Sequence, residues 1–403
     1  MKCKLLLSAT LVSASLMASA QQQNTAYAIT GKTDNKYFWA DIKQIDVSTG
    51  KVVKTLFEAD KTKFTTSFIN KTDASIKVNP TAYGVAACAF DARHNRLYFA
   101  PMHFSDIYYL DLSSRDANFT VVKKSIIPTT STSNYQTEEN HITRMVFGAD
   151  GYGYALTNDA KHLIRFTTDK NPVVEDLGQV TDAAENAISF HDKLSAWGGD
   201  MVADAFGKLV VVTARHNVFT IDVNNKTAAF TGTITGLPEY YTTNGAVVDN
   251  DGNLVVSTAN VYDGLYTVNI NDLKAVKIES TEKTFNASDL ANNKFLSQKK
   301  YDDAKAGILP GGCIVDSKLS KVFPNPVLGT TFNVSFINQK EGAYNVLFTD
   351  LSGKLIQSVR VIVGKGDQTK TIALNKKPLK GFYFVKVTDA NKKLIVSEKI
   401  IAN

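Results

Sequence analysis

The sequence predicts an all-β protein in which a five-bladed β-propeller is followed by a small β-sandwich. Three observations support this fold class. A hairpin of two short apolar strands recurs along residues 21–320, and each copy is followed by a third strand in which apolar and polar residues alternate. A weaker fourth strand comes next, which makes four antiparallel strands per repeat. Residues 321–403 instead hold six or seven short alternating runs, the pattern of a sandwich.

The clearest copy of the hairpin is Gly245–Ser257, where Asp-Gly-Asn separates two valine runs. Asp and Asn tolerate a positive φ and glycine adopts it without steric cost, so this tripeptide is a turn signal. The other copies turn at Asn95, Gly151 and Gly207, and the four turns are 56, 56 and 45 residues apart, a spacing typical of propeller blades lengthened by insertions. Because the same frame recurs, the acidic turn at Asp249 is interpreted as a hairpin rather than as a calcium loop.

The first repeat lacks an innermost strand. Ala26–Thr30, Ile42–Val47 and Val52–Phe57 supply its second, third and fourth strands. Gly311–Asp316 matches the innermost pattern but no second strand follows it, so we expect it to complete the first blade and close the ring. This count gives five blades. Six blades is the alternative, because Asn286–Ala306 could contain strands, although its Asp, Lys and Ala content favours a helical insertion.

The same alignment bears on two cysteines. Cys88 and Cys313 fall in one column of the repeat, and ring closure would make their blades adjacent. A disulfide between them requires Cα atoms within about 7 Å. Two buried apolar thiols are the alternative reading.

Residues 1–20 have the pattern of a signal peptide. Lys2 and Lys4 give a positive start, residues 5–16 form an apolar stretch, and residues 18–20 (Ala-Ser-Ala) form a small-residue cleavage site. The apolar stretch is too short for a membrane anchor and no later run reaches a spanning length, so we predict export and no transmembrane segment.

The net charge of +6 is unevenly distributed along the chain. Residues 321–403 hold 13 Lys and Arg against 5 Asp and Glu, a net of +8. With the signal peptide set aside, residues 21–320 are net negative, at −4. No basic stripe crosses the predicted propeller, so nucleic acid is not an expected partner.

A series of short motifs in residues 321–403 resembles a known family. Phe-Pro-Asn-Pro comes first, then Asp-Leu-Ser-Gly-Lys, then Gly-Phe-Tyr-Phe-Val-Lys-Val and a final lysine. In this order they are similar to the type A C-terminal sorting domain of the type IX secretion system of Bacteroidetes, with Phe323 where tyrosine is commoner. The residues that carry the sorting motif are Pro324, Asn325, Pro326, Gly353, Gly381 and Lys399.

The resemblance implies a route and a partner. Such a chain passes through the periplasm and the outer membrane as cargo of the secretion machinery, and is then released or attached to the cell surface. Together with the signal-peptide pattern and the recurring hairpins, it predicts a signal peptide at 1–20, a propeller at 21–320 and a sorting domain at 321–403. Because these tails are fused to unrelated cargo, the resemblance implies nothing about the activity of residues 21–320.

Candidate ligand-binding residues come from the long connections between repeats. In a propeller these connections and the loops after each second strand emerge on one face, where function usually lies. That face is rich in aromatic and imidazole side chains, which suit a glycan or protein ligand; packing of their own loops is the alternative. The candidates are Trp39, His103, Phe104, His141, Trp197, His216, Tyr240, Tyr241 and Tyr262.

Motifs for catalysis are absent from the sequence. No nucleophile elbow, phosphate-binding loop or dinucleotide fingerprint occurs, and the histidine spacing does not favour a metal site, so no cofactor is predicted and catalytic residues are unknown. A glycoside hydrolase or polysaccharide lyase is the alternative to a binding protein, because catalytic carboxylates could come from different blades. A deep axial pocket with two carboxylates would favour the enzyme, and a shallow aromatic face would favour binding.

Overall fold

The computed structural model describes residues 24–32, 37–69, 79–127, 138–280, 282–305, 322–323, 327, 329–336, 339–350, 353–365, 368–390 and 393–402. The predicted signal peptide, Cys313 and Pro324–Pro326 lie outside these ranges. The chain divides into two compact units, Met1–Lys299 and Lys300–Asn403. Within the described ranges, no helix combines the length and the apolar character that crossing a membrane requires.

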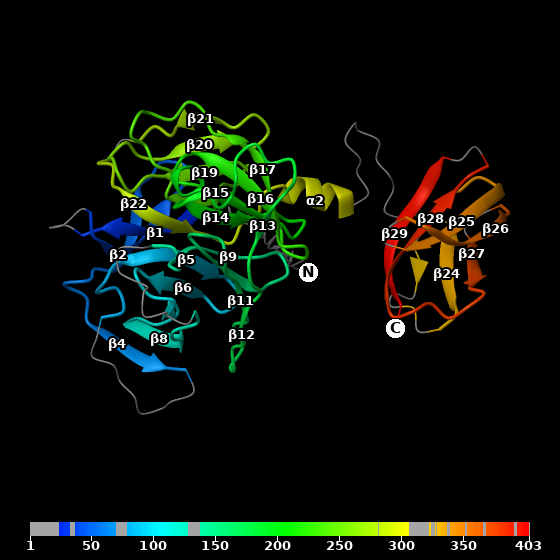
Figure 1. The fold of residues 1–403 in the computed structure, drawn as a ribbon, viewed down its shortest axis with the longest axis horizontal. Helices are drawn as coiled ribbons and strands as arrows, with labels where there is room; N and C mark the ends of the chain where they lie inside the picture. The colour runs from blue at the N-terminus through cyan, green and yellow to red at the C-terminus, as the bar shows by residue number, and fades with distance from the viewer. Residues whose placement is uncertain are drawn as a thin grey trace, which may run out of the picture. The chain divides into compact units, whose positions relative to one another are not determined.

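The first unit is a β-propeller of five blades (Figure 1). From the axis outward, the first blade contains β22 (Ala287–Ala291), β1 (Thr25–Gly31), β2 (Trp39–Asp46) and β3 (Val52–Phe57). The second contains β5 (Val85–Asp91), β6 (Arg96–Pro101), β7 (Ile107–Asp111), β8 (Ala117–Lys123) and a parallel outer strand, β4 (Phe64–Phe68). The third contains β9 (Ile142–Phe147), β10 (Gly153–Thr157), β11 (Leu163–Phe166) and β12 (Val174–Asp176).

The last two blades follow the same plan. The fourth contains β14 (Asp200–Ala203), β15 (Leu209–Val212), β16 (Asn217–Asp222), β17 (Thr227–Thr233) and a parallel outer strand, β13 (Thr181–Asp182). The fifth contains β18 (Gly245–Val248), β19 (Leu254–Ser257), β20 (Tyr266–Asn269) and β21 (Lys274–Lys277). Two short helices, α1 (Lys193–Ala196) and α2 (Gln298–Lys305), lie in connecting segments.

The predicted hairpins form, and their turn residues have the expected backbone conformation. Asn95, Gly151, Gly207 and Gly252 all have positive φ, between 51° and 86°. At the last of these turns, Asp249 Oδ1 accepts hydrogen bonds from the backbone N–H of Asp251 and Asn253 at 2.9 and 2.8 Å. The Asp249 carboxylate therefore holds its own turn, as the hairpin interpretation requires.

The ring closes through a strand other than the one predicted. The innermost strands β22, β5, β9, β14 and β18 are neighbours in that order, and β18 returns to β22. The strand beside β1 is Ala287–Ala291, with Ala28 opposite Leu290, so the prediction that Gly311–Asp316 fills this place is wrong. Residues 311–316 themselves lie outside the described ranges. Ser288 and Asp289 interrupt the apolar pattern of β22, so the sequence does not indicate a strand at this place. The helix that we expect in residues 286–306 begins only at Gln298.

Apolar side chains fill the spaces between neighbouring blades. Between the second and third blades, the ring of Tyr98 lies 5.5 Å from that of Phe147 and 5.4 Å from that of Phe166, and all three are buried. Each such side chain contributes about 1.5–3 kcal/mol when it is removed from water. The blades therefore cohere mainly through the sheet faces that they present to each other.

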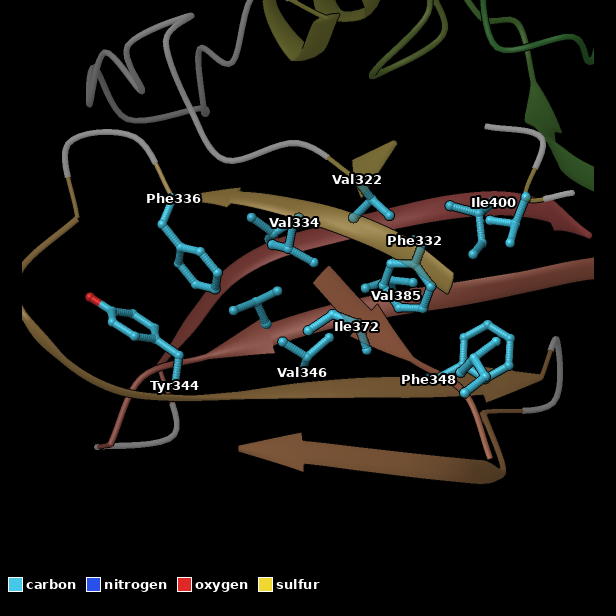
Figure 2. Packing of buried hydrophobic residues seen from close by; sticks show 14 of the residues in the cluster. Val322, Phe332, Val334, Phe336, Tyr344, Val346, Phe348, Ile372, Val385 and Ile400 are labelled. Carbon is cyan, nitrogen blue, oxygen red and sulfur yellow. The ribbon is translucent and has the colours of Figure 1, made fainter. Parts of the chain in front are cut away.

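The second unit is a two-sheet sandwich. One sheet contains β23 (Val322–Phe323), β24 (Thr331–Phe336) and β27 (Gln368–Ala373), and the other contains β26 (Leu355–Val363), β25 (Gly342–Asp350), β28 (Gly381–Thr388) and β29 (Leu394–Ala402). Figure 2 shows Phe332, Val346, Ile372 and Val385 pointing into the space between the sheets. The six alternating runs predicted between 331 and 400 are confirmed as strands.

Candidate functional site

One end of the propeller carries the long connections, and we call it the long-loop face. Strand register identifies it: Val85, the first residue of β5, pairs with Pro101, the last residue of β6. The segments that enter the blades and the loops after each second strand therefore lie at the same end. The long-loop face consists of the segments before β5, β9, β14, β18 and β22 and the loops after β1, β6, β10, β15 and β19.

All nine candidate residues belong to segments of the long-loop face, and every blade contributes at least one. Their places in the chain are the start of β2 for Trp39, the β6–β7 loop for His103 and Phe104, the segment before β9 for His141, the segment before β14 for Trp197, the β15–β16 loop for His216, the segment before β18 for Tyr240 and Tyr241, and the β19–β20 loop for Tyr262. Eight of the nine side chains are partly or largely exposed.

Tyr241 is the exception, because its side chain is too buried to contact a ligand. Its side chain is 2% exposed, and its hydroxyl donates to the carbonyl oxygens of Val256 and Gly264, both at 3.0 Å. Its ring lies 5.0 Å from that of Tyr266. Tyr241 therefore anchors the fifth blade from within, while Tyr240 beside it is 74% exposed.

Two histidines meet between the second and third blades. The rings of His103 and His141 are perpendicular, with centroids 5.1 Å apart. Burial lowers the pKa of His141, and the neighbouring His103 lowers it further. Neutral His141 presents one N–H donor and one acceptor, the combination that recognises hydroxyl groups. Beside this pair, the rings of Phe104 and half-exposed Tyr83 lie 5.1 Å apart and extend an aromatic edge.

The two tryptophans offer ring surface rather than hydrogen bonds. Both indole rings are partly exposed, but their Nε1 atoms are buried and have no acceptor among the described residues. The ammonium group of Lys193 lies 4.8 Å from the ring centroid of Trp197. A cation over one face leaves the ring able to stack with a ligand on its remaining surface. Trp39 and Trp197 are thus suited to apolar and stacking contacts.

Three candidate residues have an unusual backbone conformation. His103, His216 and Tyr240 adopt φ of 67°, 68° and 66°, a region that costs non-glycine residues roughly 1–3 kcal/mol. His216 Nε2 donates to the carbonyl oxygen of Tyr241. This hydrogen bond links the loop that carries His216 to the residue that follows Tyr240. Strained residues persist only where surrounding contacts fix them, and they concentrate at binding sites.

Backbone contacts join the candidate loops across blades. The Asn158 side-chain oxygen accepts a hydrogen bond from the Gly198 N–H at 2.7 Å, and the Asn158 backbone N–H donates to the His141 carbonyl oxygen at 3.0 Å. One residue of the third blade therefore fixes the loops that carry His141 and Trp197. This connection fixes part of the long-loop face before any ligand is present, and a preformed surface loses less entropy on binding.

Beneath the long-loop face, four polar side chains meet near the propeller axis, and we call them the axial cluster: Cys88, Arg144, Asp200 and Asp289. Each comes from a different innermost strand and none is more than 1% exposed. None of the four was selected as a binding or catalytic candidate from the sequence. The only available signal is a polar residue inside an apolar inner strand.

The carboxylates of the axial cluster bind backbone groups of other strands. Asp200 accepts from Met201 N–H at 2.6 Å and from Ala246 N–H, in β18, at 2.7 Å. Asp289 Oδ1 accepts from both the N–H and the thiol of Cys88, in β5, at 3.1 and 2.9 Å. Each carboxylate therefore connects its own innermost strand to the next.

The guanidinium of Arg144 caps a set of carbonyl oxygens. It donates to Ala196 at 2.6 Å, to Gly198 at 2.7 and 3.2 Å, and to Thr157 at 3.3 Å.

The chain can turn tightly next to these carbonyls only because residue 199 is glycine. Gly199 has φ of +89°, and a Cβ there would lie 1.9 Å from the Val212 carbonyl oxygen. This turn aims Asp200 at the axis.

Burial sets the protonation of the axial cluster. It raises the pKa of Asp200 and Asp289 well above the usual range, and for Asp289 the neighbouring Asp200 charge adds to the effect. Burial also raises the pKa of the Cys88 thiol and lowers the pKa of Arg144 to about 10. Asp200 and Asp289 therefore each hold a proton to a higher pH than a solvent-exposed carboxyl group does.

A small cavity lies between the innermost strands of the five blades. Residues of β5, β9, β14, β18 and β22 line it, and its volume of about 10 Å³ is enough for one water molecule. Met145, Val202, Val247 and Leu290 are among the side chains that line it. A cavity of this size does not admit a sugar ring.

Cys88 is expected to be chemically inert in the folded protein. Its thiol is buried and donates to Asp289, and its raised pKa keeps the reactive thiolate scarce. We expect no labelling of Cys88 by a maleimide within an hour under native conditions and complete labelling in 6 M guanidinium, measured by peptide mass spectrometry. Rapid native labelling would contradict the buried position.

Cys313, the predicted disulfide partner of Cys88, lies outside the described residues. The strand that closes the ring beside β1 is β22, and not the strand that was expected to carry Cys313.

Several solved structures resemble this chain distantly. PorZ, an essential bacterial surface component of the type IX secretion system of Porphyromonas gingivalis, is 14% identical with a TM-score of 0.31, over 91% of this chain and 50% of PorZ. A Bacteroides thetaiotaomicron protein of unknown function is 14% identical with a TM-score of 0.38, over 66% of this chain and 70% of that one. Virginiamycin B lyase of Staphylococcus aureus is 9% identical with a TM-score of 0.29, over 80% and 86%.

This chain spans half the length of PorZ. Comparison with curated proteins gives no match. A family model does match the C-terminal part, over the whole of the predicted sorting domain. Residues 321–403 are a secretion system C-terminal sorting domain.

Proposed function

We propose that this protein is a cell-surface or released β-propeller that binds a glycan through its long-loop face. The sorting domain implies export by the type IX secretion system. One observation carries the binding proposal: each of the five blades places at least one partly exposed aromatic or imidazole side chain at the same end. Ring faces stack on the apolar faces of sugars, and the His103–His141 pair supplies donors and acceptors for hydroxyl groups.

The strained loops and the contacts across blades support a preformed surface. His103, His216 and Tyr240 have positive φ although none is glycine. Asn158 fixes the loops of His141 and Trp197. A preformed aromatic surface suits a neutral polymer that lies across it, because little ordering entropy is lost on binding.

A glycan array with the chain that begins at residue 21 tests this proposal. We expect a defined class of polysaccharide to bind, and we expect Trp39→Ala and Trp197→Ala each to weaken that binding by about tenfold or more, since buried aromatic contacts dominate such interfaces. Neither indole nitrogen has an acceptor among the described residues, so these substitutions remove no hydrogen bond identified there. Phe206→Ala is the matched control, because Phe206 is 54% exposed in the β14–β15 turn at the opposite end.

Two results would refute the proposal. One is the absence of any glycan that binds above background, and the other is unchanged binding by both tryptophan variants. A peptide array run in parallel identifies a protein ligand, which would replace the glycan in the proposal. Release of reducing or unsaturated ends from a bound polysaccharide would instead support the hydrolase or lyase alternative, which the small size of the cavity between the innermost strands disfavours.

A further inference from the structure

The sorting domain carries a groove that its core does not use, and we call it the tail groove. It has a volume of about 400 Å³ and lies between the start of β26 and the segment that leads from β27 to β28. Phe348, Ile356, Leu379 and Tyr383 line its apolar part, and Lys376 and Lys377 line the rest. Its volume falls within the range of sites that bind a small molecule or a peptide side chain.

The walls of the tail groove are fixed by interactions within the domain. The rings of Phe348 and Tyr383 stack, with centroids 4.8 Å apart, and the Tyr383 hydroxyl donates to the Leu379 carbonyl oxygen at 2.8 Å. The amide of Gln357 bridges the two sheets, donating to the Ala373 carbonyl oxygen and accepting from the Asn375 N–H, both at 2.8 Å. The groove is therefore a preformed feature and not a gap between loose loops.

Large apolar side chains of the tail groove face solvent. Leu379 is 83% exposed and Ile356 is 50% exposed. Exposing such side chains on a rigid surface gains nothing for the domain itself, so a contiguous exposed apolar site indicates an interaction surface. The Tyr383 hydroxyl holds the backbone of Leu379 through its carbonyl oxygen. The exposed Leu379 side chain nevertheless contributes almost nothing to the domain core.

Charge indicates what kind of segment fits the tail groove. Lys376 and Lys377 are exposed on its rim, Lys380 follows Leu379, and no carboxylate pairs with these three lysines among the described residues. Residues 321–403 together carry a net charge of +8. A partner segment with carboxylates beside an apolar side chain would pair with the lysines on the rim and pack against the apolar part of the tail groove.

We propose that the tail groove is a docking site for a protein segment in which an apolar side chain is flanked by acidic residues. The apolar side chain packs against Leu379 and the Phe348–Tyr383 stack, and the acidic residues pair with Lys376 and Lys377. Because a sorting domain acts during export, the partner that carries this segment is met on the way to the cell surface. The proposal is independent of what the propeller binds.

Export of the full-length chain from a Bacteroidetes host with an active type IX system tests the proposal. We expect Leu379→Asp to lower the exported amount, measured by immunoblot of cell-surface, medium and periplasmic fractions, by about tenfold or more, as for loss of an interface hot spot. The double variant Lys376→Glu, Lys377→Glu should show a similar loss. Leu394→Asp is the control, since Leu394 is a leucine of the same domain, 53% exposed in β29 and outside the groove.

A photo-crosslinking amino acid at position 379 identifies the occupant in the same cells. A protein adduct that disappears in the double lysine variant supports the proposal. An adduct to lipid or polysaccharide, or normal export of both groove variants, overturns it. Thermal unfolding of the purified variants completes the test, because Leu379 and the two lysines are exposed and their replacement should leave the melting temperature within about 2 °C of the wild type.

Discussion

Arg144→Leu is expected to lower the free energy of unfolding of the propeller by about 3–5 kcal/mol, or to prevent folding. Arg144 is fully buried and donates to the carbonyl oxygens of Thr157, Ala196 and Gly198. Leucine would remove the donor from the Ala196 and Gly198 carbonyl oxygens and would also remove the positive charge that lowers the pKa of Asp200, so two uncompensated costs add.

Urea unfolding followed by tryptophan fluorescence measures this loss in the propeller alone. The chain has two tryptophans, Trp39 and Trp197, and both lie in the first unit. Arg165→Leu is the control, because Arg165 is partly exposed and pairs with Glu175 at 2.8 Å on the surface of the third blade. Such surface pairs contribute about 0–1 kcal/mol. A loss of less than about 1 kcal/mol in Arg144→Leu would show that the guanidinium is dispensable.

Asp289→Asn is expected to be increasingly more stable than the wild type as pH rises from about 4 towards 8. Burial and Asp200 raise the pKa of Asp289, so the folded state holds a proton that the unfolded state releases above its ordinary pKa. Stability from this group is fully present below the unfolded pKa and is lost as pH rises towards the folded pKa, by up to about 1.4 kcal/mol per pH unit for one proton. Asparagine does not titrate and keeps the oxygen that accepts from Cys88.

The comparison with Asp289→Ala makes this expectation specific. Alanine removes the titration as well, but it also removes the acceptor for the Cys88 N–H and opens a cavity at the axis. That variant should therefore be less stable than the wild type at pH 5 by about 2–4 kcal/mol. The groups that face Asp289 are Cys88 and Asp200, with Arg144 beyond Asp200. A stability difference between Asp289→Asn and the wild type that does not change with pH would exclude a retained proton.

The strands could be predicted from the sequence wherever one face of a sheet is buried. The short alternating runs expected within residues 321–403 are strands in the structure, among them Leu355–Val363, because the exposure of its side chains alternates along the strand. The turn residues could be predicted because Gly151, Gly207 and Gly252 occupy backbone conformations that few other residues tolerate. Both signals are local, since each depends only on neighbours in the chain.

The axial cluster and the closing strand could not be predicted, because their partners are remote in sequence. In the sequence, Asp289 has the pattern of a solvated polar residue. The donor of its hydrogen bonds is Cys88, which lies 201 residues away and cannot be identified from a local pattern. Strand β22 was therefore interpreted as part of a helical insertion. Within the long-loop face, Tyr240 and Tyr241 are adjacent in a loop, where no strand or helix period tells which side chain is buried.

Closure of the ring by β22 has a consequence for the order of events during synthesis. Strand β1 begins at Thr25, yet its inner neighbour is not available until Ala287–Ala291 has been made. A partly synthesised propeller therefore leaves the inner edge of β1 unpaired, and such an edge is prone to pair with other chains. Contacts so distant in sequence also form slowly. Since β22 immediately precedes the second unit in the chain, the ring can close only shortly before residues 321–403 are synthesised.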